Sequence, residues 1–276
     1  MALPNEETIV TAAMCSGLAE LTIRQPAGTF ALTPGSLISL QAIGKHRDLL
    51  TGNGLDWGSG TGCLAIAAAK IPAVQHVIGL EIVEANVTAA CENAQRNGVQ
   101  DRVSFLLSDS YMPRHPAGRA SLEELRGRVN VILANPHSSE GDDGFGCRRL
   151  VLQGARRFLI PGGVVFLMVS IQYGQERLRR LCAEAPGFVH GGELASTDWV
   201  PFDLARPDRM HNLRLYVAEE RRGGLAYDFR HPDRSQPERS QPAGMTAQAA
   251  LAHYGRTGES PLTRWEVHLF SFRPAS

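Results

Sequence analysis

The stretch that decides the fold runs from residue 53 to residue 69 and contains three alternating glycines. It is Asn53-Gly54-Leu55-Asp56-Trp57-Gly58-Ser59-Gly60-Thr61-Gly62-Cys63, followed by the alanine-rich run 64–69. We interpret it as the end of a strand, a tight turn and the start of a helix, because glycine adopts positive φ freely and alanine favours helix. The N–H groups at the helix start would then point at a ligand lying across the glycines.

A dinucleotide and S-adenosylmethionine are the two ligands that suit such a turn. The dinucleotide fingerprint G-x-G-x-x-G/A fails when it starts at Gly58, because its last position is then Cys63. A start at Gly60 leaves no acidic residue ahead of the turn in that frame. The stretch does match Asp56-x-Gly58-x-Gly60-x-Gly62. This pattern resembles the first motif of class I S-adenosylmethionine-dependent methyltransferases, and the resemblance implies S-adenosylmethionine as the cofactor.

Two further strands end in acidic residues. Residues 75–82 indicate a buried strand with Glu81 at its end, and residues 103–110 indicate another that ends at Asp109. Glu81 lies one strand-helix-strand step after the glycine turn, where a carboxylate can accept both ribose hydroxyls of an adenosine. The resemblance implies that Asp109 binds the adenine amino group. A solvated glutamate and an ordinary turn aspartate are the competing interpretations.

The residues predicted to bind the cofactor come from these strand ends and from the one that follows. They are Asp56, Gly58, Ser59, Gly60, Thr61, Gly62, Glu81, Ile82, Asp109, Ser110 and Asn135.

A fourth buried strand, 129–134, ends in Asn135-Pro136-His137-Ser138. Reaction chemistry in open α/β sheets lies outside the carboxyl ends of the strands. Asn135-Pro136 resembles the first half of the Asn-Pro-Pro-Tyr motif of methyltransferases that act on planar nitrogens. The resemblance implies that the Asn135 carboxamide oxygen and the Pro136 carbonyl accept hydrogen bonds from the acceptor NH₂. Asn135, Pro136 and His137 are the predicted catalytic residues.

The second half of that motif departs from the family pattern. His137 replaces the second proline and Ser138 replaces the aromatic residue, so the usual stacking surface is missing. Tyr111 or Phe145 is expected to supply a ring instead, and both join Ser138 as predicted acceptor-binding residues. His137 suggests an alternative, a general base for a hydroxyl or ammonium acceptor, although a histidine beside a proline is more often a turn residue.

The resemblance extends over about residues 27–185. The loop 141–145, a helix, Pro161-Gly162-Gly163 and an apolar strand are similar to the same region of HemK/PrmC-type enzymes. It implies an α/β fold of the class I, Rossmann-like type, with a seven-stranded, mostly parallel sheet and helices on both faces. We expect three parts: an N-terminal helical segment 1–50 that roofs the cofactor, a cofactor-binding core 51–200, and a C-terminal elaboration 201–276 on the acceptor side.

The terminal parts give weaker signals. Apolar spacing predicts a helix over 5–24, and another helix is expected from about residue 36, capped by Ser36, to residue 50. Alternation over 213–218 predicts a strand. Residues 230–244 contain a tandem Arg-Ser-Gln-Pro repeat typical of a solvated loop. A helix over 246–254 and a closing strand over 265–272 follow. Candidate acceptor contacts here are Trp199, Phe202, Arg206, Arg209, His211, Tyr227 and His253.

Composition narrows the partners. Lysine plus arginine equals aspartate plus glutamate at 28 each, which argues against a nucleic-acid acceptor and an anionic membrane. The five cysteines are scattered without a C-x-x-C pair, which suits reduced cytosolic thiols and predicts no metal site. The sequence contains neither a secretory signal nor a long apolar run. We therefore expect a cytoplasmic enzyme with a small-molecule or peptide acceptor, and its oligomeric state stays open.

The predicted reaction is methyl transfer to a nitrogen aligned by Asn135. A release-factor methyltransferase is not favoured, because only about 50 residues precede the glycine turn. The alternatives are an O-methyltransferase that uses His137 as base, and a protein that binds the cofactor without catalysis. A nicotinamide dehydrogenase is disfavoured by Cys63.

Overall fold

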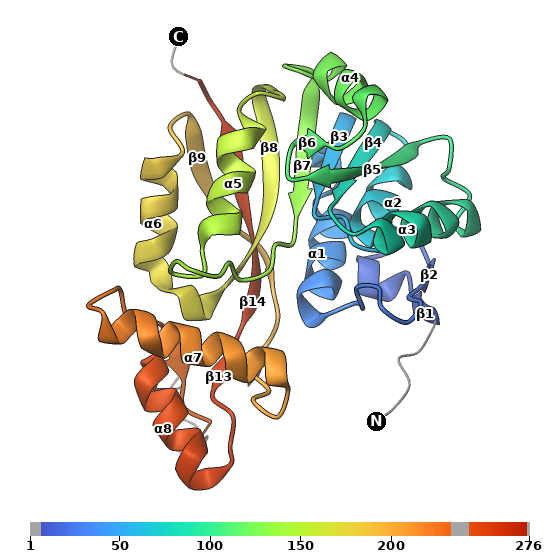
Figure 1. Ribbon diagram of the computed structural model, residues 1–276. Helices are drawn as coiled ribbons and strands as arrows, with labels where there is room; N and C mark the ends of the chain where they lie inside the picture. Colours follow the sequence, from blue (N-terminus) through green and yellow to red (C-terminus); the bar gives the residue numbers. More distant parts are fainter. Residues whose placement is uncertain (1–6, 233–242, 275–276) are drawn as a thin grey trace.

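An eight-stranded sheet forms the centre of the protein (Figure 1). The computed structural model describes residues 7–232 and 243–274, and the statements below concern these residues. The strands, in spatial order, are β6 (Met112–Pro113), β5 (Val103–Asp109), β4 (Val74–Glu81), β3 (Gly52–Trp57), β7 (Val129–Ala134), β8 (Leu159–Ser170), β14 (Trp265–Phe272) and β9 (Phe188–Ser196). Neighbours from β5 to β8 are parallel, and β14 runs antiparallel between β8 and β9. The predicted mostly parallel sheet is confirmed, with the two-residue β6 as an additional edge strand.

Helices follow the strands and cover the sheet. They are α1 (Pro34–Lys45), α2 (Cys63–Ala69), α3 (Glu84–Arg96), α4 (Pro116–Glu124), α5 (Gly146–Ala155) and α6 (Gly174–Glu184), with short 3-10 turns at Ala13–Cys15, Arg47–Leu49 and Ile171–Tyr173. Contacts run from α1 to α2 to α3 and separately from α5 to α6. These two groups cover opposite faces of the sheet, as predicted for the fold class.

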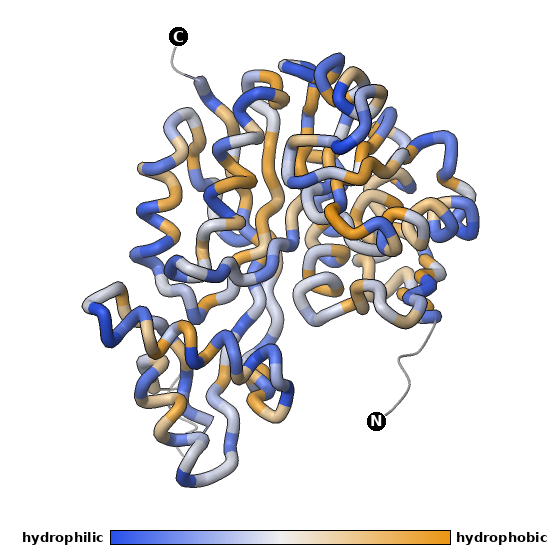
Figure 2. Tube along the Cα trace, in the orientation of Figure 1, coloured by the Kyte–Doolittle hydropathy of each residue, from blue (hydrophilic) through white to orange (hydrophobic). Residues whose placement is uncertain are grey.

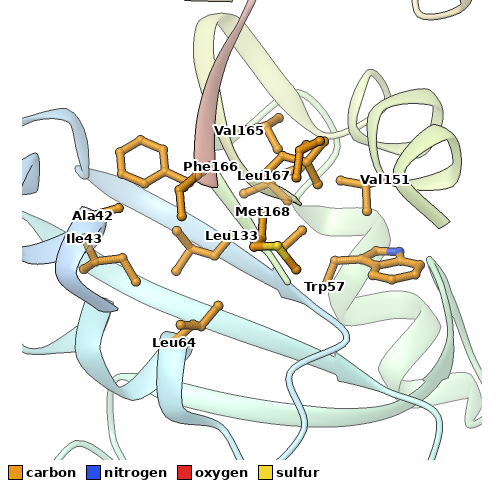
Figure 3. Packing of buried hydrophobic residues seen from close by; sticks show 14 of the residues in the cluster. Ala42, Ile43, Trp57, Leu64, Leu133, Val151, Val165, Phe166, Leu167 and Met168 are labelled. Carbon is orange, nitrogen blue, oxygen red and sulfur yellow. The ribbon is translucent and has the colours of Figure 1, made fainter. Parts of the chain in front are cut away.

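The hydrophobic core lies on both faces of β3, β7 and β8. The apolar runs 131–134 of β7 and 164–169 of β8 suit strands that are buried on both sides. Figure 2 shows this as apolar colour along the central strands, with hydrophilic residues on the outer turns of the helices. In Figure 3, Ile43 and Leu64 from α1 and α2 lie on one side of Leu133, and Val151 from α5 lies on the other. Burial of these side chains holds the carboxyl ends of the parallel strands in fixed positions.

The first segment of the chain corrects a prediction. The expected helix over 5–24 is wrong: β1 (Glu7–Val10) pairs antiparallel with β2 (Leu21–Arg24). Both strands contain β-branched residues, which favour extended backbone. Over so few residues, the spacing of the apolar positions fits both a helical and a strand period. Asn93 of α3 and its C-cap residue Asn97 decide between them, because their carboxamides bond the main chain of Arg24 and Thr22, respectively. Sequence periodicity has no access to those long-range hydrogen bonds.

Helix α1 begins earlier than expected. Its N-cap is Thr33, not Ser36: the Thr33 hydroxyl accepts from the Ser36 N–H at 3.2 Å, and the Ser36 hydroxyl accepts from the Thr33 N–H at 3.3 Å. This reciprocal capping box satisfies two donors at the helix start. It also places both hydroxyls at the carboxyl end of β7.

The C-terminal elaboration forms a lobe beside the carboxyl ends of the parallel strands (Figure 1). It contains α7 (Pro207–Arg221), α8 (Ala247–Thr257) and a small sheet of β10 (Val200–Pro201), β13 (Leu262–Thr263), β11 (Phe229–Arg230) and β12 (Gly244–Met245). The strand predicted over 213–218 is wrong, because these residues belong to α7. Leu213, Tyr216 and Val217 are its buried residues, at helical spacing. The predicted helix near 246–254 and the strand over 265–272 are confirmed, whereas the repeat at 233–242 lies outside the described residues.

Candidate functional site

The glycine turn has the backbone geometry expected of it. Gly58, Gly60 and Gly62 adopt φ of 68°, 53° and 88°, values that non-glycine residues rarely adopt. The N–H groups of Gly58 and Ser59 both donate to the Leu80 carbonyl, at 2.9 and 3.0 Å, which ties the turn to β4. A side chain at Gly58 would meet no atom within 4 Å, so there is open space beside the turn.

Asp56 is fully buried under this turn. Its Oδ2 accepts the Ala65 N–H at 3.0 Å, which fixes the start of α2. Its Oδ1 has no hydrogen-bond partner among the described residues, and neither has the buried Ser59 hydroxyl. Burial raises the Asp56 pKa from 3.8 to about 7; the Ala65 hydrogen bond opposes this rise and the nearby Glu81 charge adds to it. An orphaned carboxylate oxygen in this position suits a cationic or N–H-bearing ligand.

Glu81 at the end of β4 connects the turn to the next loop. Its Oε2 accepts the Gly60 N–H at 2.8 Å and its Oε1 accepts the Val83 N–H at 2.9 Å. Each oxygen keeps a lone pair for a further donor. Beside it, Ile82 is 50% exposed, and Val83 is exposed too. Exposed aliphatic side chains next to a fixed carboxylate suit a ligand that joins an apolar ring to hydroxyl groups.

The end of β5 completes this side of the site. Asp109 is exposed there, and Ser110 adopts a left-handed φ of 51°. The Trp57 indole N–H donates to the Ser110 hydroxyl at 2.9 Å, linking the ends of β3 and β5. The structure therefore brings the predicted carboxylates of three strands to one edge of the sheet. Orphaned polar atoms, a glycine turn with open space and an exposed aliphatic platform fit an adenosine bearing an amino acid.

Asn135 lies in the loop after β7, against the N-terminus of α1. Its Nδ2 donates to the Ser36 hydroxyl at 3.3 Å. A Cβ on Gly35 would come within 3.1 Å of the Asn135 Oδ1, so a glycine is needed for this close approach. The hydrogen bond to Ser36 fixes the carboxamide and leaves Oδ1 as an acceptor.

Arg148 of α5 holds the loop that follows. Its side chain is 1% exposed and donates to the carbonyls of Pro136 (3.2 Å), His137 (3.4 Å), Gly144 (3.4 Å) and Met168 (3.1 Å). Sequence reasoning missed this residue, since nothing in its local pattern distinguishes it from the neighbouring Arg149 of the same helix. The buried Arg148 guanidinium thus fixes the main chain of the loop 135–138, whose second half departs from the family motif.

A pocket of about 150 Å³ lies between this loop and α7. Its lining includes the predicted residues Asn135, Pro136, His137 and Ser138, and the candidates Arg206 and Arg209. Sequence reasoning missed Phe30, Asp208, Asn212, Tyr216 and Trp265, which also line it. Phe30 lies close to Gly60, within 3.3 Å of where a Cβ would stand, so the pocket adjoins the glycine turn.

The two rings proposed to replace the missing aromatic residue lie elsewhere. Tyr111 is buried, stacks on Phe158 and donates to the Val151 carbonyl at 2.9 Å. Phe145 is fully buried against Tyr173. Neither lines the pocket, so their predicted role as acceptor contacts is wrong. Both rings are instead buried in the apolar core on the α5 side of the sheet, because removing their apolar surface from water is favourable.

Ser138 contacts a residue of the C-terminal lobe. The Tyr216 hydroxyl of α7 donates to the Ser138 hydroxyl at 3.2 Å. An aromatic ring is therefore placed next to the position where the family motif has its own, but it comes from the C-terminal elaboration.

The remaining candidate contacts do not line this pocket. Phe202 packs on Phe229, Tyr227 stacks on Tyr216, and His211 pairs with Glu140 at 3.2 Å. His253 is buried against His231, and the Trp199 ring lies under Arg230. No group of three His, Cys, Asp or Glu side chains in the described ranges is placed to hold a metal ion. Nor does any described helix have the length and apolar character needed to cross a membrane.

Comparison with known proteins agrees with this geometry. Residues 26–136 match the family model for ribosomal protein L11 methyltransferase (PrmA). The chain has the class I methyltransferase fold, and its residues 26–136 are similar to this family. The match confirms the enzyme class and the predicted cofactor, S-adenosylmethionine, for this domain.

Individual relatives cover only part of the chain. A release factor glutamine methyltransferase of Cereibacter sphaeroides is 31% identical over 175 residues, which are 59% of this chain and 60% of the relative. A ribosomal RNA small subunit methyltransferase C of Alcanivorax borkumensis is 30% identical over 50% of this chain and 38% of the relative. The solved 16S rRNA N2 G1207 methyltransferase of T. thermophilus shares the fold, with a TM-score of 0.51 and 24% identity over 69% of this chain and 48% of that one. The chain thus spans less than two thirds of the length of these relatives.

These names correct the predicted acceptor. The relatives are named for a release factor, ribosomal protein L11 and ribosomal RNA, so the expectation of a small-molecule acceptor, and the argument against nucleic acid, are overturned. The physical error was to use the net charge of the whole chain. A neutral total says nothing of how charge is distributed around one site.

Proposed function

We propose that the protein transfers a methyl group from S-adenosylmethionine to a nitrogen of a macromolecule, with Asn135 aligning the acceptor. The observation that carries the proposal is the position of Asn135. Its carboxamide lies at the carboxyl end of β7, lines the pocket and is fixed by Ser36 with Oδ1 left to accept. The named substrates of the relatives, a protein side chain and an RNA base, support a planar nitrogen in a macromolecule.

The cofactor-binding roles are part of this proposal. Glu81 would hold the ribose hydroxyls, Asp109 and Ser110 would face the adenine, and Ile82 would cover its plane. Asp56 and the turn 58–62 would hold the amino acid part, which suits the orphaned Asp56 oxygen. Bound S-adenosylmethionine supplies an electrophilic methyl group. Its chemistry asks the protein chiefly to align the acceptor nitrogen and to exclude water.

Alignment follows from the geometry of the loop. Asn135 Oδ1 and the Pro136 carbonyl would accept the two hydrogens of an acceptor NH₂, which turns the nitrogen lone pair out of that plane. Arg148 bonds the Pro136 and His137 carbonyls and so keeps the Pro136 acceptor in place, while Ser36 fixes the Asn135 carboxamide. Orientation of this kind contributes on the order of 7–11 kcal/mol to well-aligned reactions. A catalytic base is not required for a planar amide or a base nitrogen.

The experiment is methyl transfer from labelled S-adenosylmethionine to ribosomal RNA, ribosomal protein and release factor fractions, each offered separately. Asn135→Ala should lower turnover by at least about tenfold, because the charge that develops on the nitrogen loses an acceptor. Affinity for S-adenosylhomocysteine, measured by calorimetry, should change less than about threefold. Full turnover in Asn135→Ala would refute the role of Asn135.

His137 gives a second variant with a different meaning. It is exposed, lines the pocket and has its Nε2 3.7 Å from the Cys147 sulfur. His137→Ala should keep most of the turnover if the acceptor is a planar nitrogen. Loss of turnover in His137→Ala, with Asn135→Ala active, would instead support the O-methyltransferase alternative.

A further inference from the structure

The wall of the pocket opposite Asn135 belongs to α7. Arg206, Asp208, Arg209 and Asn212 line it from the first turns of this helix, which lies outside the part of the chain that the family model matches. We infer that this wall is a binding site for a phosphate group of a single-stranded RNA segment, whose base enters the pocket toward Asn135. The inference rests on the proposed function and names the substrate class of the same site.

Charge is the first argument. Three arginines line the pocket, Arg148, Arg206 and Arg209, against the single carboxylate of Asp208. Asp208 is bound by Arg206 through two hydrogen bonds of 3.1 and 2.9 Å, while its distance to the Arg209 Nε is 4.0 Å. Arg148 is buried and bonded to main-chain carbonyls. The pocket therefore has an excess of positive charge within low-dielectric walls, which concentrates its attraction for an anion.

Arg209 is held in position for such a ligand. Its side chain is 17% exposed, and its guanidinium lies over the Trp265 ring at 4.5 Å and the Phe202 ring at 5.4 Å. Stacking on aromatic faces orders a guanidinium while its N–H edges stay available. Such an edge matches two phosphate oxygens. Burial and the neighbouring Arg206 charge lower the pKa of Arg209, so an anion there would relieve an existing repulsion.

The aromatic lining distinguishes RNA from an acidic peptide. Phe30 is 45% exposed at the pocket and close to the glycine turn, and Tyr173, Tyr216 and Trp265 contribute further rings. Single-stranded RNA is recognised by stacking of splayed bases on aromatic side chains together with basic contacts to its backbone. A pocket with the exposed Phe30 ring beside the glycine turn and arginines on the α7 wall fits a nucleotide better than a carboxylate side chain.

The test uses fluorescence anisotropy of the full protein with a labelled single-stranded RNA oligonucleotide at several salt concentrations. Arg209→Gln and Arg206→Gln should each weaken binding by about tenfold and lower the slope of log K against log salt by about 0.7. Arg206 is exposed, so its substitution leaves the buried residues intact. Arg214→Gln is the matched control: it is an exposed arginine of the same helix that does not line the pocket, and it should bind RNA like the unmodified protein.

Two results would overturn the inference. One is equal RNA affinity and salt slope in Arg206→Gln, Arg209→Gln and Arg214→Gln. The other is preferential binding of a polyglutamate peptide over the RNA by the unmodified protein. Calorimetry with S-adenosylhomocysteine keeps the proposals separate, because Arg209→Gln should bind it normally. If the unmodified protein does not bind S-adenosylhomocysteine, the proposed methyl transfer is refuted. The dependence of RNA affinity on Arg206 and Arg209 still decides the inference in that case.

Discussion

Asp56→Asn should remove a specific pH dependence of stability. In the folded protein the buried Asp56 has a pKa of about 7, against an ordinary value of 3.8. Between these values the folded state keeps the proton and the unfolded state releases it. The free energy of unfolding therefore falls as pH rises from about 4 through 7, because the folded state binds more protons. An asparagine keeps the acceptor for the Ala65 N–H and does not titrate.

The size of the effect follows from the two pKa values. The free energy of unfolding changes by about 1.36 kcal/mol for each pH unit over which only the folded state holds the proton. Titration of Asp56 therefore lowers this free energy by roughly 2 kcal/mol as pH rises from 5 to 7. Above about pH 8 the cost no longer grows. The Asp56→Asn variant should therefore gain stability relative to the unmodified protein as pH rises through this window. The rise in affinity for S-adenosylmethionine with pH should also be weaker in the variant, because an ionised Asp56 favours the cationic amino acid part.

Urea unfolding without cofactor at pH 5, 6, 7 and 8 measures the difference between the two proteins. Other titrating groups are common to both and cancel in the comparison. Parallel curves of stability against pH would refute the reasoning, and would mean that Asp56 is ionised in the folded state. Asp109→Asn, at an exposed position of the same sheet edge, is the matched control for the loss of one carboxylate.

Three further variants test other parts of the site. Glu81→Ala should weaken S-adenosylhomocysteine binding at least about tenfold in calorimetry, because the Gly60 N–H loses its acceptor, whereas the exposed Glu84→Ala should not. Gly62→Ala should lower the free energy of unfolding, measured with urea, by about 1–3 kcal/mol, since φ is 88° and a Cβ would stand 2.8 Å from the Phe105 ring; an unchanged free energy would contradict the left-handed turn. Arg148→Met should reduce turnover by about 10–100-fold in the methyl-transfer assay with little change in cofactor affinity, because the loop after β7 loses its positioning; a loss of cofactor affinity alone would contradict that role.

Local sequence was sufficient where one strand-turn-helix unit carries its own signal. The glycine turn, its acidic neighbours and Asn135 were predicted because parallel strands place their carboxyl ends at a common edge. Short, largely apolar runs at 77–80 and 131–134 identified β4 and β7, since strands buried on both faces need no alternation.

The apolar pattern predicted the wrong secondary structure where a helical and a strand period fit the same short segment. Residues 5–24 and 213–218 are examples, and their structure is decided by contacts with α3 and its C-cap and with α8, respectively. Tyr111 and Phe145 were assigned to the acceptor by their nearness in sequence, yet the tertiary core buries them.

The sequence by itself determined the fold class and which residues stand at the strand ends, because these depend on backbone rules that act within one βαβ unit, and its resemblance to a known motif indicated the cofactor. Only the tertiary structure decided what faces Asn135. Arg148 of α5 donates to the Pro136 carbonyl in the loop after β7, Tyr216 donates to the Ser138 hydroxyl, and Arg209 lies over the Trp265 ring at the pocket. These residues come from segments far apart in the chain, and their approach depends on how the C-terminal lobe packs against the carboxyl ends of the strands, which no local pattern encodes.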